Sequence, residues 1–301
     1  MRIDAIKEIG AAGYCMYEYE PEYRYRSDGV CGNDRYRENT RLLAWLASYR
    51  MFGSEPDRCK AVVSFRNRLE ENDVLNDVLF LEKMSGDVIM DCDRGYPCAL
   101  KSYFGGKRPT ALFCLGRKEL LDEPMILICG ARDASEGAIK LARKCGLYAV
   151  GRGYTVASGY ARGVDRAAHL GALEAGGSTV AFLPFGLSRF RVSRDIAGEF
   201  DPERFCVVSE VPPTYGFTAQ SAFRRNRFLI ALSEAVIVIE PGDGGGSWYT
   251  AERAVGMRKP LFFLEGSRPD VVGKMAPLGG IRLRVKKGVP DLDPVYEQCA
   301  R

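Results

Sequence analysis

The sequence predicts an α/β protein in which a parallel sheet carries helices on both faces and follows a small, mainly helical N-terminal domain. Three observations lead to this prediction. The 301 residues are 46% hydrophobic and 27% charged, which is typical of a folded protein and long enough for one large or two ordinary domains. Helical periodicity marks the first ninety or so residues. Beyond residue 95, short apolar runs alternate with helical stretches.

The predicted N-terminal domain spans residues 1–94. It begins with an irregular, tyrosine-rich stretch from Tyr14 to Tyr36, whose side chains we expect to pack locally rather than to stack on bases. Apolar residues then recur at helical spacing in two stretches, Leu42, Trp45, Leu46 and Tyr49, followed by Val74, Leu75, Val78 and Leu79. The domain is therefore expected to be mainly helical.

The second predicted domain spans residues 95–301. Five nearly all-apolar runs are expected to be strands covered on both faces: 125–129, 154–157, 179–183, 205–208 and 235–239. Candidate helices lie between them at about 135–150, 163–175, 217–232 and 247–257. This alternation predicts a parallel sheet with right-handed crossovers, and such sheets bind ligands beyond the carboxyl ends of their strands.

Composition narrows the possible functions. The net charge of +4 is too small to indicate nucleic-acid binding by itself. The ten cysteines form no C-x-x-C pair and His169 is the single histidine, so we expect reduced thiols of a cytoplasmic protein, no metal site and no cofactor. No apolar run reaches the ~20 residues of a spanning helix, and the N-terminus does not resemble a signal peptide. We therefore expect neither export nor membrane insertion.

Glycines and arginines gather where the predicted strands end, in the segments 130–135, 158–165 and 242–247, and three arginines lie within residues 224–227. Glycine turns before helices expose backbone N–H groups, and arginines neutralise anions. Each loop alone is a common strand-to-helix turn, but together they predict a phosphate-binding rim. The candidate residues are Gly130, Ala131, Arg132, Ser135, Ser158, Gly159, Arg162, Gly163, Arg225, Asn226, Arg227, Gly246, Ser247 and Thr250.

Distinct roles are expected within this set. We expect N–H groups of Gly130, Ala131, Gly246 and Ser247 to hold phosphates. Solvated arginines at positions 132, 162, 225 and 227 would neutralise them, although one or two arginines of the 224–227 run could instead cover a helix face. Two nearby aromatic side chains, Tyr160 and Trp248, are candidates for stacking on bases, and Trp248 could equally be buried.

Five blocks of sequence resemble, in the same order, the signature of the DNA-processing protein A (DprA/Smf) family: 130–135, 153–173, 208–212, 223–227 and 246–251. The resemblance implies an extended Rossmann-like fold that binds single-stranded DNA, forms a homodimer and assists loading of the recombinase RecA during DNA uptake, recombination and natural transformation. Arg224 stands where the family usually has proline, and Gly245 where it has serine. The acidic residue Asp243 in the last glycine-rich loop is also unlike the usual family sequence.

An enzymatic function is less favoured by the sequence. Asp165 and His169 stand four residues apart and could form an acid–base pair, but we expect His169 to pack beneath the loop before it. The segment 241–247 also resembles the signature of nucleoside-monophosphate phosphoribohydrolases, yet Thr250 stands where the catalytic acid belongs. Glu252, two residues on, would be rotated by about 200° around the helix. We therefore expect a binding protein without catalytic residues, with nucleotide binding or sensing as the alternative.

Overall fold

The computed structural model describes residues 71–300 of the chain. The chain divides into two compact units, Met1–Lys83 and Met84–Arg301. Helix α4 (Glu71–Lys83) is the described part of the first unit, and it contains the second of the two predicted helical stretches. The tyrosine-rich stretch and the first helical stretch lie outside the described residues, so the helical character of that domain stays a prediction.

The second unit is built on a nine-stranded sheet with the order β1-β2-β6-β5-β4-β3-β7-β8-β9. All five predicted strands are present. The strands are β1 (Asp87–Met90), β2 (Ala111–Gly116), β3 (Met125–Gly130), β4 (Thr155–Ser158), β5 (Thr179–Leu183), β6 (Phe205–Ser209), β7 (Ala235–Ile239), β8 (Leu261–Leu264) and β9 (Ile281–Arg282). From β6 to β9 every pairing is parallel, as predicted, whereas β2 is antiparallel to both β1 and β6. Since β1 pairs within this sheet, the sheet unit begins before the predicted domain boundary at residue 95.

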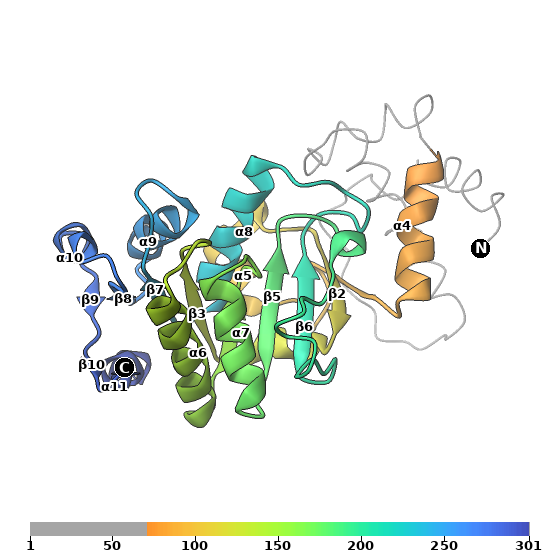
Figure 1. Cartoon of the computed structure of the whole chain (residues 1–301). Helices are drawn as coiled ribbons and strands as arrows, with labels where there is room; N and C mark the ends of the chain where they lie inside the picture. The colour runs from red at the N-terminus through yellow and green to blue at the C-terminus, as the bar shows by residue number, and fades with distance from the viewer. Residues whose placement is uncertain (1–70, 301) are drawn as a thin grey trace. The chain divides into compact units, whose positions relative to one another are not determined.

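Helices cover both faces of the sheet, which confirms the predicted architecture (Figure 1). Within β3, Leu127 and Cys129 belong to one apolar core, and Ile126 and Ile128 to the other, because successive strand side chains point to opposite faces. The first core is covered by α5 (Cys98–Phe104), α8 (Ala219–Leu232), α9 (Gly246–Gly256) and α10 (Asp270–Met275). The second is covered by α6 (Glu136–Gly151), α7 (Val164–Glu174) and α11 (Asp293–Cys299).

Shorter elements complete the unit. They are the 3₁₀ turns η2 (Gly105–Lys107), η3 (Lys118–Asp122) and η4 (Leu187–Arg189), and a two-stranded ladder of β10 (Val285–Lys286) and β11 (Val289–Pro290). No helix among the residues from 71 onward is long and apolar enough to cross a membrane.

The strand order places a crevice at the centre of the sheet. β3 pairs with β4 on one side and with β7 on the other, so the chain runs outward from β3 to β6 and then returns across β3 to β7. The helices that follow β3 and β7, α6 and α9, cover opposite faces. Their connecting loops therefore diverge and leave space beyond the carboxyl ends of these two strands, where ligands of such sheets bind.

Candidate functional site

A pocket of about 860 Å³ opens at this crevice. It is formed by the loops that follow β3, β4, β7 and β8 and by the first turns of α8 and α9. Ten of the fourteen predicted site residues line it: Gly130, Ala131, Arg132, Ser135, Gly159, Arg225, Asn226, Gly246, Ser247 and Thr250. The loops after β3, β4 and β7 thus meet at one edge of the sheet, as the strand-end pattern predicted, and the loop after β8 joins them there.

Two of the remaining predicted residues have partners elsewhere. The Ser158 hydroxyl is fully buried and donates to the Ile128 carbonyl at 2.6 Å, so it joins β4 to β3 below the pocket. Arg162 is exposed, but its guanidinium pairs with Asp133 across the loops after β3 and β4. Neither side chain lines the pocket.

The other two predicted site residues outside the pocket, Gly163 and Arg227, have packing roles. Gly163 has a φ of +84°, and a Cβ atom there would lie 2.4 Å from the Ala131 carbonyl oxygen, so glycine allows the loop after β4 to approach the loop after β3. The Arg227 guanidinium lies over the ring of Phe104 at 5.1 Å from its centroid. Arg227 therefore covers the helix face of α8 that is turned toward α5 rather than the pocket.

Arg225 lines the pocket but is not solvated, which contradicts the sequence-based expectation. Its side chain is only 7% exposed, and its Nη1 donates to the Phe182 carbonyl at 2.5 Å. Burial lowers the pKa of this guanidinium to about 10. A Cβ atom on Gly159 would lie 2.2 Å from Nη1, so the glycine leaves room for the buried arginine. The sequence could not reveal that Arg225 is buried, because the groups around its side chain, Gly159 after β4 and Phe182 in β5, are distant from it along the chain.

Asp165 ties the loops after β3 and β4 together. Its buried carboxylate accepts a hydrogen bond from the Ala161 N–H at 3.2 Å. Burial raises the pKa of Asp165, while Arg225 and the backbone N–H groups of Ala161, Gly130 and Gly159 act in the opposite direction. The carboxylate therefore occupies backbone donors that could otherwise have faced a ligand.

A second carboxylate, Glu240, occupies the start of α6. Its Oε2 accepts from the Ser135 N–H at 2.7 Å and its Oε1 accepts from the Ser267 N–H at 2.9 Å, and these bonds help to lower its pKa against the effect of burial. The Ala131 N–H donates to the Ile239 carbonyl at 3.3 Å. The expectation that the loop after β3 would hold a phosphate through the N–H groups of Gly130 and Ala131 is therefore wrong.

The start of α9 leaves its backbone N–H groups more open than the start of α6 does. Its N-cap is Gly245, which has no side chain to accept from the first turn, and that turn carries no acidic residue. The first N–H groups of a helix have no acceptor within the helix. The Thr250 hydroxyl donates to the Gly246 carbonyl at 2.8 Å, and the Asn226 amide does so at 3.4 Å, which fixes this turn in the pocket wall. The predicted placement of Gly246 and Ser247 at the pocket thus has a structural basis.

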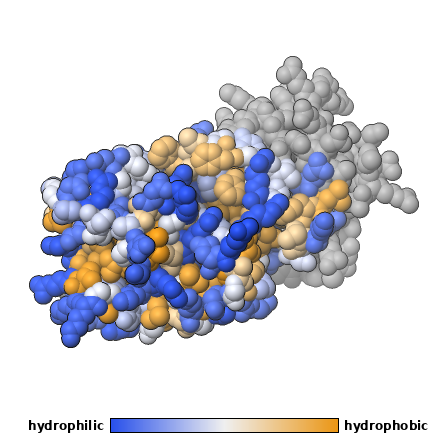
Figure 2. Space-filling model, in the orientation of Figure 1, coloured by the Kyte–Doolittle hydropathy of each residue, from blue (hydrophilic) through white to orange (hydrophobic). Residues whose placement is uncertain are grey.

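Aromatic side chains stand at the pocket rim, and the sequence analysis missed them. Phe217 is 56% exposed and Phe223 is 46% exposed, and both line the pocket. The Phe223 ring meets Tyr249 edge to face at 4.7 Å, and Arg253 lies over the Tyr249 ring at 5.0 Å. Figure 2 shows a hydrophobic patch over the upper end of α8. The signal for Phe217 was its place at the first residue of the predicted helix 217–232, and the observed helix begins two residues later, at Ala219.

The two aromatic residues that were expected to stack have other roles. Tyr160 is only 8% exposed, and its hydroxyl accepts from the Ser193 N–H at 2.9 Å, so the stacking prediction for Tyr160 is wrong. Trp248 is half-buried and donates to Glu252 at 3.0 Å. His169 packs at 5.5 Å from the Tyr160 ring and its Nδ1 lies 2.6 Å from the Thr179 hydroxyl, which confirms the predicted packing role.

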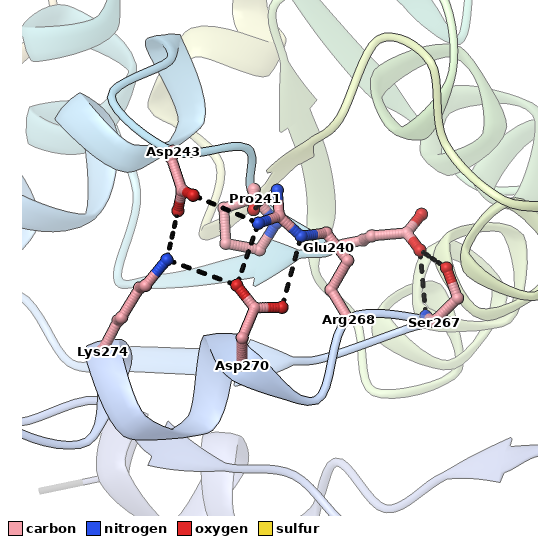
Figure 3. A network of polar contacts seen from close by, with 7 residues as sticks. All are labelled: Glu240, Pro241, Asp243, Ser267, Arg268, Asp270 and Lys274. Atoms are coloured by element: carbon pink, nitrogen blue, oxygen red, sulfur yellow. Dashed lines mark hydrogen bonds and ion pairs between the residues drawn. The ribbon is translucent and has the colours of Figure 1, made fainter.

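Arg268 is a further pocket residue that the sequence analysis missed. It follows β8 and belongs to a network of ion pairs with Asp243, Asp270 and Lys274, drawn in Figure 3. The apolar run of β8 followed by Gly266, Ser267 and Arg268 repeats the strand-end pattern of the other loops, so the signal was present in the sequence. Within residues 71–300, no cluster of side chains is suited to hold a metal ion.

Comparison with known sequences identifies relatives. The sequence model of the DNA recombination-mediator protein A family matches residues 87–275. DNA processing protein DprA of Streptococcus pneumoniae is 30% identical over 198 residues, which cover 62% of this chain and 64% of that protein. Protein Smf of Escherichia coli is 32% identical over 160 residues, covering 52% and 43% respectively. The chain thus spans less than two thirds of the length of these relatives.

Solved structures share the fold. DprA of S. pneumoniae superposes with a TM-score of 0.60 at 24% identity, covering 80% of this chain and 88% of that one. DprA of Helicobacter pylori, a structure concerned with single-stranded DNA binding, gives 0.56 at 21% identity, covering 72% and 95%. These likenesses confirm the predicted Rossmann-like fold. Since the family model matches more than half of its residues, the chain belongs to the DNA recombination-mediator protein A family, also known as DprA/Smf.

Proposed function

We propose that this protein binds single-stranded DNA in the pocket at the centre of the sheet and does so without catalysis. The observation that carries the proposal is that the uncapped first turn of α9 and the exposed rings of Phe217 and Phe223 open into one pocket. A helix start accommodates a phosphate, and an aromatic face accommodates any base. A single strand presents both groups at every nucleotide.

The charges of the lining support a specific placement of the phosphate. Asp165 and Glu240 already accept hydrogen bonds from the backbone, so their charges are compensated within the protein. A phosphate at α6 would nevertheless meet the Glu240 carboxylate. At α9 it would meet N–H groups instead, and the exposed Arg132, in the loop after β3, lines the same pocket. We therefore place the strand backbone along α9 and Arg132.

Family membership supports finer proposals. The family is described as recombination mediators, and the H. pylori relative binds single-stranded DNA. We propose that this chain likewise assists loading of a RecA-type recombinase onto the strand during DNA uptake and recombination, as in natural transformation, and that it acts as a homodimer in the cytoplasm. The relatives extend beyond the matched residues, so these roles are proposed for the chain from the family alone.

The alternative candidate is binding of a free nucleotide. It is favoured by the volume of the pocket, about 860 Å³, which falls in the range of small-molecule sites. Hydrolysis of the nucleotide is disfavoured, because Glu252 is exposed, accepts from Trp248 and does not line the pocket. Thr250, which does line it, has no carboxylate to act as a base.

The two candidates are separated by titrating the protein with labelled oligothymidylate and with free nucleoside monophosphates at two salt concentrations. Single-strand binding predicts tight binding of the oligonucleotide, with a slope of log affinity on log salt near −1.4 if roughly two phosphates are neutralised. Binding of monophosphates alone would favour the alternative, and no binding of either at low salt would refute both. Release of free base, abolished by Glu252→Gln, would overturn the non-catalytic assignment.

Variants locate the binding surface. Arg132→Gln and Phe223→Ala are expected to weaken oligothymidylate binding, since the first removes a cation and the second a stacking surface from the pocket. Arg152→Gln is the matched control. Like Arg132, Arg152 is exposed. It pairs with Asp293 and follows α6 at the opposite edge of the sheet. Equal affinity of Arg132→Gln and Arg152→Gln would refute the placement.

A further inference from the structure

Asp243 lies in the glycine-rich loop between β7 and α9. Its neighbours Gly242 and Gly245 line the pocket. The Asp243 carboxylate accepts from Lys274 Nζ at 2.6 Å and from Arg268 Nη2 at 3.4 Å (Figure 3). This residue therefore joins the pocket rim to the loop after β8 and to α10.

The two cations it contacts also share a second carboxylate, Asp270. Arg268 donates to Asp270 through Nη2 at 2.9 Å and through Nε at 3.4 Å, and its Nη1 donates to the Pro241 carbonyl at 3.3 Å. Lys274 Nζ lies 3.3 Å from Asp270. Two cations and two carboxylates thus form a cluster without net charge. Arg268 reaches the pocket, and its side chain is 34% exposed.

We propose that Arg268 and Lys274 are a phosphate-binding pair for the DNA strand, and that Asp243 covers this pair in the unbound protein and is displaced by a phosphate. The inference rests on the proposed function, because it adds the pocket residue Arg268, its neighbour Lys274 and a competing anion, Asp243, beside the same pocket. An arginine and a lysine side by side suit a phosphate, which has several acceptor oxygens. The first turn of α9 begins three residues after Asp243.

Asp243 is the carboxylate that can leave. Asp270 stands in the first turn of α10 and holds the arginine through two donors. Asp243 is more exposed, 63% against 45%, and three glycines follow it, of which Gly244 has a φ of +64°. A glycine-rich loop can change conformation with little steric cost. The Asp243 side chain can therefore move away while Asp270 keeps Arg268 at the rim.

The charge of Asp243 persists at neutral pH. The hydrogen bond from Lys274 lowers its pKa, with smaller contributions from Arg268. An ionised carboxylate that occupies a phosphate-binding pair competes with any incoming phosphate. Asp243 is thus expected to weaken strand binding and to reduce the number of cations that the strand neutralises.

The test compares Asp243→Asn with wild type in oligothymidylate titrations across a range of salt concentrations. The substitution keeps the size of the side chain and removes its charge. It is expected to raise affinity severalfold at low salt and to steepen the slope of log affinity on log salt by about 0.7, the value for one more neutralised phosphate. Adding Lys274→Gln to this variant is expected to abolish most of the gain, because the uncovered cation is then absent.

Asp293→Asn is the matched control, because it makes the same change in net charge. Asp293 is similarly exposed, at 67%, and its partner Arg152 lies at the opposite edge of the sheet. If the wild-type protein binds the oligonucleotide and Asp243→Asn binds it no more tightly than Asp293→Asn does, the inference is overturned and the proposed function stands. Weaker binding by Asp243→Asn would overturn it as well, since Asp243 would then position Arg268 rather than cover it. Absence of binding by every variant at low salt would refute both.

Discussion

His169 provides a sharp test of how the interior beneath the loop after β4 is built. It is the single histidine of the chain and is fully buried beneath the loop after β4. The Thr179 hydroxyl donates to the Val156 carbonyl and so accepts from His169 Nδ1, while His169 Nε2 has no hydrogen-bond partner. Burial lowers the pKa of this imidazole to about 3, with Arg225 and Arg166 acting in the same direction.

The direction of the pH effect follows from that pKa. The folded state holds His169 neutral, whereas the unfolded chain takes up a proton near its ordinary pKa of 6.5. The stabilising contribution is therefore complete above pH 6.5 and is lost as the pH falls toward the folded pKa. Between pH 7 and pH 5 the free energy of unfolding should fall by about 2 kcal/mol from this residue alone. This loss in the free energy of unfolding depends little on the pKa of His169 in the folded state, provided that this pKa is below about 4.

The measurement is urea unfolding followed by circular dichroism at pH 7, 6 and 5 and constant ionic strength, on wild type and His169→Asn. Asparagine keeps a donor for Thr179 but does not titrate, so the variant should be less stable at pH 7 and should lose about 2 kcal/mol less between pH 7 and pH 5. Burial raises the pKa of Asp165, which opposes the trend equally in both proteins. Parallel pH profiles for the two proteins would refute the buried, neutral state of His169.

Three further predictions concern the pocket walls and the core. Gly130→Ala should destabilise by about 2 kcal/mol or more, because its Cβ atom would lie 2.0 Å from the Ile239 carbonyl oxygen. Gly256→Ala, whose Cβ atom would have nothing within 4 Å, should be nearly neutral when the two variants are compared by thermal unfolding. Arg225→Ala should lower the unfolding temperature, whereas the exposed Arg132→Ala should not, and equal unfolding temperatures would contradict the buried role of Arg225. In the folded protein, thiol reagents should modify the exposed Cys92 and Cys98 but spare the buried Cys114, Cys129, Cys145 and Cys206, as mass spectrometry of labelled peptides would establish.

The sequence predicted the sheet elements well where their signal is local. The strands of residues 179–183 and 235–239 begin and end as expected, because both are nearly all-apolar runs with clear boundaries, Ser178 and Pro184 for the first and Glu234 and Glu240 for the second. β1 was missed because a strand of four residues carries little periodicity and its pairing with β2 is a long-range contact. The antiparallel edge of the sheet was missed for the same reason.

The position of the site also followed from the sequence, because carboxyl ends of parallel strands share an edge wherever the strands pair. Loops containing Gly130, Gly159 and Gly246 were therefore expected to converge, and they do. The five blocks of sequence also identified the family. They contain the glycines and arginines of these loops, and they follow one another in the same order as the blocks of the family signature.

The tertiary structure alone decided which of those groups remain open to a ligand. A solvated arginine and a buried one look alike in sequence, yet Arg132 is exposed while Arg225 is enclosed by neighbouring strands. The same holds for backbone donors, because Glu240 occupies the Ser135 N–H across 105 residues of sequence. Periodicity reports which face of an element is apolar, but the partner of a polar atom depends on contacts between distant segments, and these exist only once the chain has folded.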